Sequence, residues 1–202
     1  ETALRRMAVT EPIKLTITNY PAGQTEYFDI PNNPRDAAAG TRKVPFTGTL
    51  YIEKSDFAEV PPPKFQRLKP GGEVRLMGAY IVKCQEIIKN DAGEITELKC
   101  TADLETANGM PTDGRKVKGT IHWVSAAHAI DGSCCLYENL FTLENTSDVP
   151  EGTNYLDYLN PDSLKRLEGC KLEPSIADVP VSTRMQFVRM GYFIKDIEEG
   201  RY

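Results

Sequence analysis

The sequence lacks the features that mark membrane, secreted and zinc-binding proteins. A membrane span needs a run of about 18 consecutive apolar residues, and the sequence has none. A signal peptide has an apolar stretch after its charged start, and none follows the charges of residues 1–6. The five cysteines contain no Cys-x-x-Cys pair. Their odd number without an export signal is typical of a reducing cytosol. We therefore expect a cytoplasmic protein with packed or half-exposed free thiols and without a structural zinc site.

Signatures of catalytic and nucleotide-binding sites are also scarce. The chain has only two histidines, His122 and His128, and Ser125 lies between them. On a strand Ser125 would point to the face opposite both rings, and no nucleophile-elbow motif is present. No glycine-rich phosphate-binding fingerprint and no distinct carboxylate pair occurs. We expect both histidines to pack or to donate hydrogen bonds, and we assign no catalytic residue and no metal site.

The charge balance argues mildly against nucleic-acid binding, because the formal net charge is −5 and phosphate affinity comes from Lys and Arg. The basic residues are nevertheless uneven, whereas acidic residues gather elsewhere, as in residues 196–199. Three basic clusters comprise Arg5 and Arg6; Lys64, Arg67, Lys69 and Arg75; and Arg115, Lys116 and Lys118. A local basic face is therefore compatible with the acidic whole.

The apolar pattern is rich in short strands. Residues 13–18 alternate apolar and polar, the period of a half-buried strand, and residues 79–89 and 95–103 form a predicted hairpin across the turn-rich segment 90–93. Further strands are expected at residues 43–54 (bent at Pro45 and Gly48), 118–123, 134–143, 163–172, 185–188 and 192–196. Short helical turns are expected near 55–57 and 154–159, and long loops at 31–42 and 106–115.

No amphipathic helix longer than about 10 residues is predicted. With 15 Gly and 14 Pro between short strands, barrels or sandwiches are the natural closures. We therefore predict an all-β fold with short helices in the connections.

Two segments combine the side chains that read splayed single-stranded bases. Residues 64–67, after the stiff prolines 61–63, are Lys-Phe-Gln-Arg, and residues 186–189 are Gln-Phe-Val-Arg. Arg and Gln pair with base edges, aromatic rings stack on bases, and Lys contacts phosphates. In the alternative interpretation, Phe65 and Phe187 are core residues and their neighbours are solvated surface. Local chemistry alone leaves both interpretations open.

Many short segments occur together in the order found in one known family. They are residues 6–9, 11–15, 19–20, 44–48, 53–57, 67–68, 73–76, 79–80, 113–119, 121–129, 136–137, 140–141, 160–164 and 186–193. Over nearly its full length the chain thus resembles glutaminyl-tRNA synthetases, in the C-terminal region that grips the anticodon.

The resemblance implies two small β-barrels in tandem. A proximal barrel would comprise residues 7–58 and 119–200 and would be interrupted by a distal barrel of residues 59–118. The family's catalytic domain carries two ATP-binding signatures, of the His-Ile-Gly-His and Lys-Met-Ser-Lys-Ser types, which are absent here. The resemblance therefore implies a non-catalytic, cofactor-free part of a longer, monomeric enzyme that joins glutamine to tRNA with ATP and Mg²⁺. Its partners would be the anticodon loop of glutamine tRNA and the catalytic domain of the same polypeptide.

The resemblance also assigns residues to RNA binding. Arg5, Gln186 and Arg189 match positions around the central uracil, Arg67 matches a reader of the third base, guanine, and Arg75 matches an arginine at the first base. The predicted RNA-binding set is Arg5, Lys64, Gln66, Arg67, Arg75, Gln186 and Arg189.

Three positions depart from the bacterial pattern. Lys64 stands where the pattern has glutamine, and Gln66 stands where it has lysine. The same two side chains are therefore still present, two positions apart. Met77 replaces a second arginine at the first-base site, and methionine offers only a flexible apolar surface with a weak acceptor. We therefore expect tolerance between cytosine and uracil at the first anticodon position.

Three rival functions remain at this stage. A glutamyl-tRNA synthetase of the non-bacterial type shares the barrel architecture and would differ in the amino acid that it attaches. A ribosomal-type β-barrel protein that binds rRNA would lack an upstream catalytic domain. A hydrolase that uses His122 and Ser125 is the most distant alternative.

Overall fold

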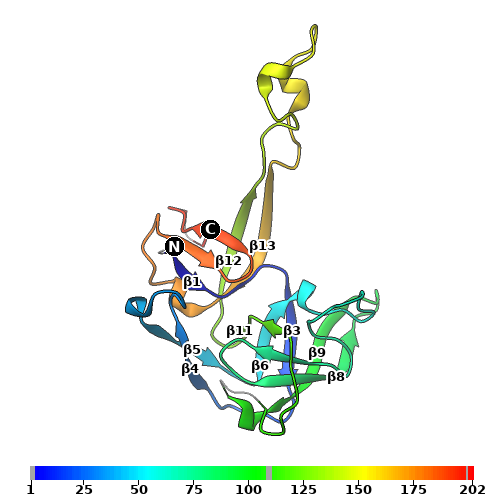
Figure 1. Cartoon of the computed structure of the whole chain (residues 1–202), viewed down its shortest axis with the longest axis vertical. Coiled ribbons are helices and arrows are strands. Elements are labelled where there is room, and N and C mark those ends of the chain that lie inside the picture. The colour runs from blue at the N-terminus through cyan, green and yellow to red at the C-terminus, as the bar shows by residue number, and fades with distance from the viewer. Residues whose placement is uncertain (1–2, 108–110, 199) are drawn as a thin grey trace.

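The computed structural model describes residues 3–107, 111–198 and 200–202, and in these ranges the fold is all-β (Figure 1). Its helices there are single 3₁₀ turns of three or four residues. They are η1 (Ala37–Ala39), η2 (Lys54–Asp56), η3 (Leu104–Thr106), η4 (Thr146–Asp148), η5 (Tyr155–Tyr158) and η6 (Pro174–Ile176). None of the helices in these ranges is long and apolar enough to cross a membrane. The predicted all-β class with short connecting helices is confirmed.

The largest unit is a curled seven-stranded sheet. Its order is β10 (Thr120–Ile121), β7 (Glu73–Leu76), β8 (Ile81–Lys89), β9 (Ile95–Asp103), β3 (Pro12–Ile17), β6 (Thr49–Glu53) and β11 (Val124–Ser125). The predicted hairpin of β8 and β9 is confirmed as an antiparallel pair. Its turn uses Gly93 at φ 80°, a conformation open to glycine, and the Asn90 side chain accepts a hydrogen bond from the Glu94 amide at 2.9 Å.

One face of this sheet buries the main core. In β3, Ile13, Leu15 and Ile17 are buried, whereas Pro12 and Lys14 are exposed, as the period-2 alternation of a strand requires. A separate ribbon of β4 (Glu26–Pro31) and β5 (Thr41–Phe46) adds aromatic rings to the same core. Phe46 packs edge-on against Trp123 with ring centroids 5.0 Å apart.

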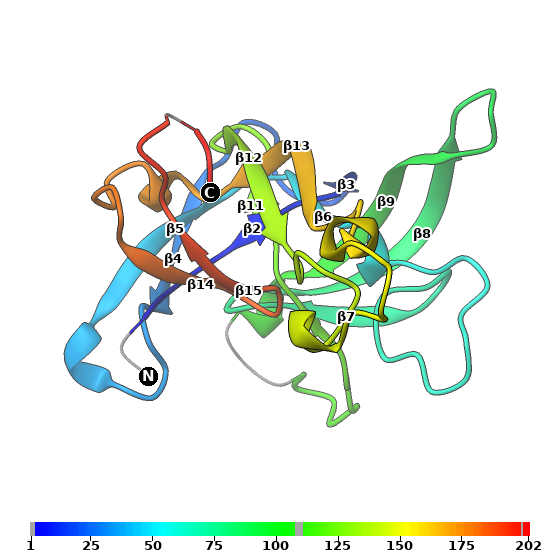
Figure 2. The same cartoon turned by 90° about the horizontal axis from the view of Figure 1, so that it is seen from above.

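A second, smaller cluster lies beside the first. It is built from two three-stranded sheets. The first has the order β12 (Ile130–Tyr137), β13 (Leu164–Leu172) and β2 (Ala8–Val9), and the second has the order β1 (Leu4–Arg6), β14 (Arg184–Phe187) and β15 (Gly191–Ile194). Phe187 stacks on Phe193 within its core at a centroid distance of 4.3 Å. Seen from above (Figure 2), β14 and the β4–β5 ribbon lie on the side opposite the projecting end of the β8–β9 hairpin.

The connection between β12 and β13 forms an arm that projects from the rest of the chain (Figure 1). Residues 138–163 carry η4 and η5, and Phe141 and Tyr155 contact each other there with ring centroids 6.0 Å apart. The predicted helical turns near 55–57 and 154–159 are confirmed as η2 and η5.

Several strand predictions need correction in extent. The bent strand expected at 43–54 is two strands, β5 and β6, separated at Thr47 and Gly48. Of the strand expected at 118–123, only residues 120–121 form a strand, β10, and β11 follows directly after that range. The strand expected at 134–143 starts at Ile130 and ends at Tyr137. The loop expected at 31–42 overlaps β4, η1 and β5, and part of the loop expected at 106–115 lies outside the described residues.

The seven-stranded sheet contains strands from both of the residue ranges predicted for the two barrels. β3 and β6 come from range 7–58, β7 to β9 come from range 59–118, and all five share the seven-stranded sheet. The barrel boundaries inferred from the resemblance therefore stay a prediction.

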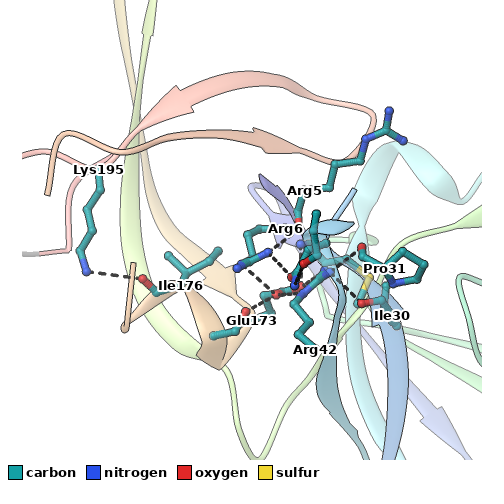
Figure 3. A network of polar contacts seen from close by, with 12 residues as sticks. Arg5, Arg6, Ile30, Pro31, Arg42, Glu173, Ile176 and Lys195 are labelled. Carbon is teal, nitrogen blue, oxygen red and sulfur yellow. Dashed lines mark hydrogen bonds and ion pairs between the residues drawn. The ribbon is translucent and has the colours of Figure 1, made fainter. Parts of the chain in front are cut away.

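A buried charge network joins the two clusters (Figure 3). The Glu173 side chain, directly before η6, accepts hydrogen bonds from Arg42 Nη2 at 2.7 Å and from the Met7 amide at 2.8 Å. Arg6 Nε lies 3.7 Å from the same carboxylate, and its Nη1 donates to the Arg5 carbonyl at 2.9 Å. This network fixes β1 and β5 against the end of β13.

Candidate nucleic-acid interface

Residues 64–67 lie on a surface loop whose two ends are held by the core. Lys64, Gln66 and Arg67 are exposed and Phe65 is half-buried. Directly after them, Leu68 is fully buried, and its amide donates to the Asp56 carbonyl at 3.0 Å. Lys64 has a φ of 66°, so the chain turns sharply after the prolines. The loop thus presents four adjacent side chains from a fixed base.

This loop faces the segment 116–119 across a hollow of about 520 Å³, which continues into a second hollow of about 440 Å³. We call the two hollows together the basic groove. Its cationic side chains are Lys64, Arg67, Lys69, Lys83, Lys116, Lys118 and Arg189, and Glu73 adds one carboxylate. The groove is therefore strongly cationic although the chain as a whole is acidic, with a formal net charge of −5.

Gly119 allows the two walls of the groove to meet. A Cβ atom at this position would lie 1.9 Å from the Gln66 carbonyl oxygen, far inside any permitted contact. The Gly119 carbonyl also accepts a hydrogen bond from the Arg75 amide at 2.9 Å. A side chain at position 119 would force the loop and the sheet apart.

A buried carboxylate, Asp56 in η2, holds two arginines of the groove. Arg189 Nη1 donates to Asp56 Oδ2 at 2.8 Å and its Nη2 donates to Oδ1 at 2.5 Å. Arg67 Nε lies 3.3 Å from the same Oδ1, and its Nη1 donates to the Ser55 carbonyl at 3.0 Å. The hydrogen bonds that Arg189 donates to Asp56 raise the pKa of Arg189 above its ordinary value, so its guanidinium stays charged.

Arg5 and Gln186 form a second, smaller site. They are direct neighbours in the parallel pair of β1 and β14, and they line a small hollow together with Arg35. Tyr192 lies opposite Gln186 on β15 and is 71% exposed. Tyr192 was not among the predicted RNA-binding residues. Its signal would have been its place at the start of the strand expected at 192–196, one short turn after the strand that holds Gln186.

Of the three residues assigned to the central base, Arg5 and Gln186 therefore lie together, whereas Arg189 lines the basic groove. Lys64, Gln66 and Arg67 line that groove with it. Phe187 is buried in the smaller core, as one of the two interpretations of residues 186–189 required. Arg189 follows the end of β14 at a φ of 67°, and this turn carries its side chain away from the ring of Phe187 and onto Asp56.

Arg75 and Met77 are not among the residues that line the basic groove. Arg75 is half-buried on β7 between its neighbours Ile81 and Thr120, outside the set that lines the groove. Met77 packs partly buried against the main core, and its carbonyl accepts a hydrogen bond from Trp123 Nε1 at 3.0 Å. Their assignment to the first base stays a prediction.

His122 packs in the interior and His128 makes a hydrogen bond, the two kinds of role that the sequence predicted. His122 is 1% exposed, and its Nε2 lies 3.8 Å from Glu53 Oε1. His128 Nδ1 lies 3.0 Å from Ser125 Oγ, which also contacts Thr47 Oγ1 at 2.9 Å. The cysteines are free and buried, as predicted. Within the described residues, no group of three or more His, Cys, Asp or Glu side chains could hold a metal ion.

Comparisons with known proteins point in one direction. The family model of the tRNA synthetases class I (E and Q), anti-codon binding domain, matches residues 3–103, and a second model of the same description matches residues 120–196. Glutamine–tRNA ligase of Rhodopirellula baltica is 51% identical over 194 residues, which cover 96% of this chain and 32% of that protein. Glutamine–tRNA ligase of Bradyrhizobium diazoefficiens is 50% identical over 195 residues, covering 96% and 34%. The chain thus spans about a third of the length of these curated relatives.

Proposed function

Because this chain belongs to the anticodon-binding domains of the class I tRNA synthetases for glutamate and glutamine, we propose that it reads the anticodon loop for a glutamine–tRNA ligase. The observation that carries the proposal is the basic groove, where Arg67 and Arg189 share the buried carboxylate of Asp56. The relatives at 50–51% identity named above are glutamine–tRNA ligases, which favours glutamine over glutamate as the amino acid. The same matches favour a synthetase over a ribosomal-type barrel.

The chemistry of the groove suits an unstacked RNA loop. Exposed lysines such as Lys116 and Lys118 would contact phosphates, and the half-buried ring of Phe65 would stack on a base. The guanidinium groups of Arg67 and Arg189 would donate to base edges. Arg5, Gln186 and the exposed Tyr192 offer a second pocket of the same kind. A wrong base would leave buried polar groups unpaired, at a cost of roughly 1–3 kcal/mol per group.

The parent enzyme would join glutamine to its tRNA during translation, with ATP and Mg²⁺ bound in a catalytic domain outside this chain. This chain would supply tRNA binding without catalysis and without a cofactor of its own. We propose that the parent enzyme is a cytoplasmic monomer. Its catalytic domain would be the second partner of this region, beside the anticodon loop.

The test is the affinity of this chain for fluorescent anticodon stem-loops. We expect a loop with the glutamine anticodon, cytosine or uracil followed by uracil and guanine, to bind more tightly than loops changed at the second or third base. Arg67→Ala and Arg189→Ala should each weaken the matched complex by about 1–3 kcal/mol, the scale of a lost base contact. Lys43→Ala is the matched control, because Lys43 is an exposed cation on β5 paired with Asp29. Equal binding of all loops by the unaltered chain would refute the proposed function.

A further inference from the structure

Arg67 and Arg189 reach the basic groove from distant parts of the sequence, and one carboxylate holds both. Arg67 lies in the loop before β7, whereas Arg189 lies in the turn between β14 and β15. The Asp56 side chain is fully buried, while the arginine side chains are 43% and 27% exposed. Each guanidinium therefore has one side on Asp56 and another part accessible from the groove.

The two arginines contact the Asp56 carboxylate differently. Arg189 uses both carboxylate oxygens in a fork at 2.8 and 2.5 Å. Arg67 approaches Oδ1, the same oxygen that accepts the shorter of these bonds, at 3.3 Å. A buried carboxylate needs a paired cation to offset its lost hydration. A shift of either arginine toward a ligand must therefore change how strongly Asp56 holds the other.

The backbone at Arg189 supports a role for this contact in positioning. Arg189 has a φ of 67°, a left-handed conformation that is unfavourable for a non-glycine residue. Such strain persists where the surroundings hold the residue in place. Here the Met190 amide donates to the Phe187 carbonyl at 3.0 Å across the turn, and the fork on Asp56 holds the side chain. The guanidinium is thereby fixed before any ligand binds.

We propose that Asp56 is a positioning residue that couples Arg67 to Arg189, so that two anticodon bases are read cooperatively instead of independently. This inference rests on the proposed function. The two bases are expected to be the second and third, to which the family resemblance assigns Arg189 and Arg67. A correct base at one arginine leaves the other in its reading position, whereas a wrong base lets the shared carboxylate shift between them.

The first experiment needs no substitution in the protein. The affinity of the unaltered chain is measured for the matched stem-loop, for loops with a single wrong second or third base, and for the loop with both wrong. We expect the double penalty to differ from the product of the single penalties by about tenfold, the size of a typical coupling between groups in one network. Penalties that multiply within twofold would overturn the inference while leaving the proposed function intact. No preference among the loops would overturn both.

The second experiment asks whether Asp56 carries the coupling. In Asp56→Asn the amide offers one acceptor oxygen, so the fork of Arg189 cannot form. We expect the discrimination at the second and third bases to fall about tenfold. The penalty for two wrong bases should then equal the product of the two single penalties, as for independent reading. Asp29→Asn is the control for the lost charge, because Asp29 is an exposed carboxylate on β4, and it should behave as the unaltered chain.

A purely structural role of Asp56 gives a different result. The thermal midpoint of Asp56→Asn would fall, but the ratios between matched and mismatched loops would stay within twofold of the unaltered chain, and this outcome would overturn the inference. If Asp56→Asn does not fold, the penalties measured on the unaltered chain decide alone.

Discussion

Gly119 is the residue at which the shape of the basic groove is most sensitive to substitution. In Gly119→Ala the new methyl group would lie 1.9 Å from the Gln66 carbonyl oxygen and 3.0 Å from Val74 Cγ2. The backbone of the loop or of β10 must therefore move. We predict a loss of about 1–3 kcal/mol of unfolding free energy, as for other overpacked sites, together with at least tenfold weaker stem-loop binding.

Urea unfolding and stem-loop titration check this prediction. Gly48→Ala is the matched control, because its Cβ would lie 3.4 Å from the Tyr20 side chain, an ordinary contact. If Gly119→Ala bound the stem-loop as tightly as Gly48→Ala, the close approach of Gly119 to Gln66 would not determine the groove.

Glu53 makes the stability of the chain depend on acid pH. Burial raises its pKa, but the imidazole of His122 and hydrogen bonds from the Thr10 and Glu11 amides lower it more, so its net pKa lies below the ordinary value. A lowered pKa in the folded state means that the charged form stabilises the fold. This stabilisation is complete above the ordinary glutamate pKa of about 4.3 and is lost as the pH falls through the lower, folded-state pKa.

Glu53→Gln removes this contribution. We predict a fall in unfolding free energy of about 1–3 kcal/mol at pH 7, because the amides of Thr10 and Glu11 lose a charged acceptor. The difference from the unaltered chain should shrink below about pH 4. Urea titrations between pH 3 and pH 7 measure both curves. Parallel curves over the whole range would show that Glu53 does not titrate with folding.

Part of the candidate site could be predicted from single residues and part could not. Lys64, Gln66 and Arg67 were identifiable because adjacent side chains of suitable chemistry follow stiff prolines. Asp56 and Gly119 carried no local signal. Their roles depend on contacts with Arg189 and Gln66, which the sequence pattern does not place beside them.

At the scale of elements, local signals predicted local pairing. The β8–β9 hairpin was predictable because its turn residues lie between two apolar strands. The parallel pairs of β3 with β9 and of β1 with β14 were not, since such pairing depends on the sum of long-range contacts. The strand expected at 118–123 is reduced to β10, because β10 pairs with β7, whereas β11, directly after the expected range, pairs with β6 at the opposite edge of the sheet.

The Glu173 network shows how distant elements are locked together. Glu173→Ala would leave the guanidinium groups of Arg42 and Arg6 buried without their carboxylate. We predict a loss of about 3–5 kcal/mol of unfolding free energy, the cost of breaking a buried ion pair on one side. Arg42→Ala should cost a similar amount, and the double variant should cost less than the two single losses added together.

Chemical denaturation of the two single variants and the double variant gives this interaction energy. Asp29→Ala is the control at an exposed ion pair with Lys43, where less than about 1 kcal/mol is expected. Additive losses at Glu173 and Arg42 would show that the two side chains stabilise the fold independently.

At the scale of the whole molecule, the distribution of charge matters more than its sum. The chain has 24 Lys and Arg against 29 Asp and Glu, so its overall field repels RNA. The basic groove instead gathers lysines from the loop before β7, from β8 and from the segment before β10. Close contacts within about one Debye length of 10 Å at 0.1 M salt outweigh the distant acidic residues. Binding should therefore depend on salt as it does for a basic protein.

The salt dependence separates phosphate contacts from base contacts. Lys116 and Lys118 are exposed in the groove wall. If both lysines contact phosphates, each contact to single-stranded RNA contributes about 0.7 to the slope of log affinity against log salt. The double variant Lys116→Ala/Lys118→Ala should therefore reduce this slope by about 1.4. The ratio between matched and mismatched loops should stay unchanged, because phosphate contacts position the RNA and base contacts specify it.

Lys43→Ala, which removes an exposed cation on β5, should leave both slope and ratio as they are. The measurement is stem-loop affinity from 50 to 200 mM salt. An unchanged slope in the double variant would mean that the RNA does not contact these lysines. A lost preference for the matched loop would mean that they contact bases and not phosphates.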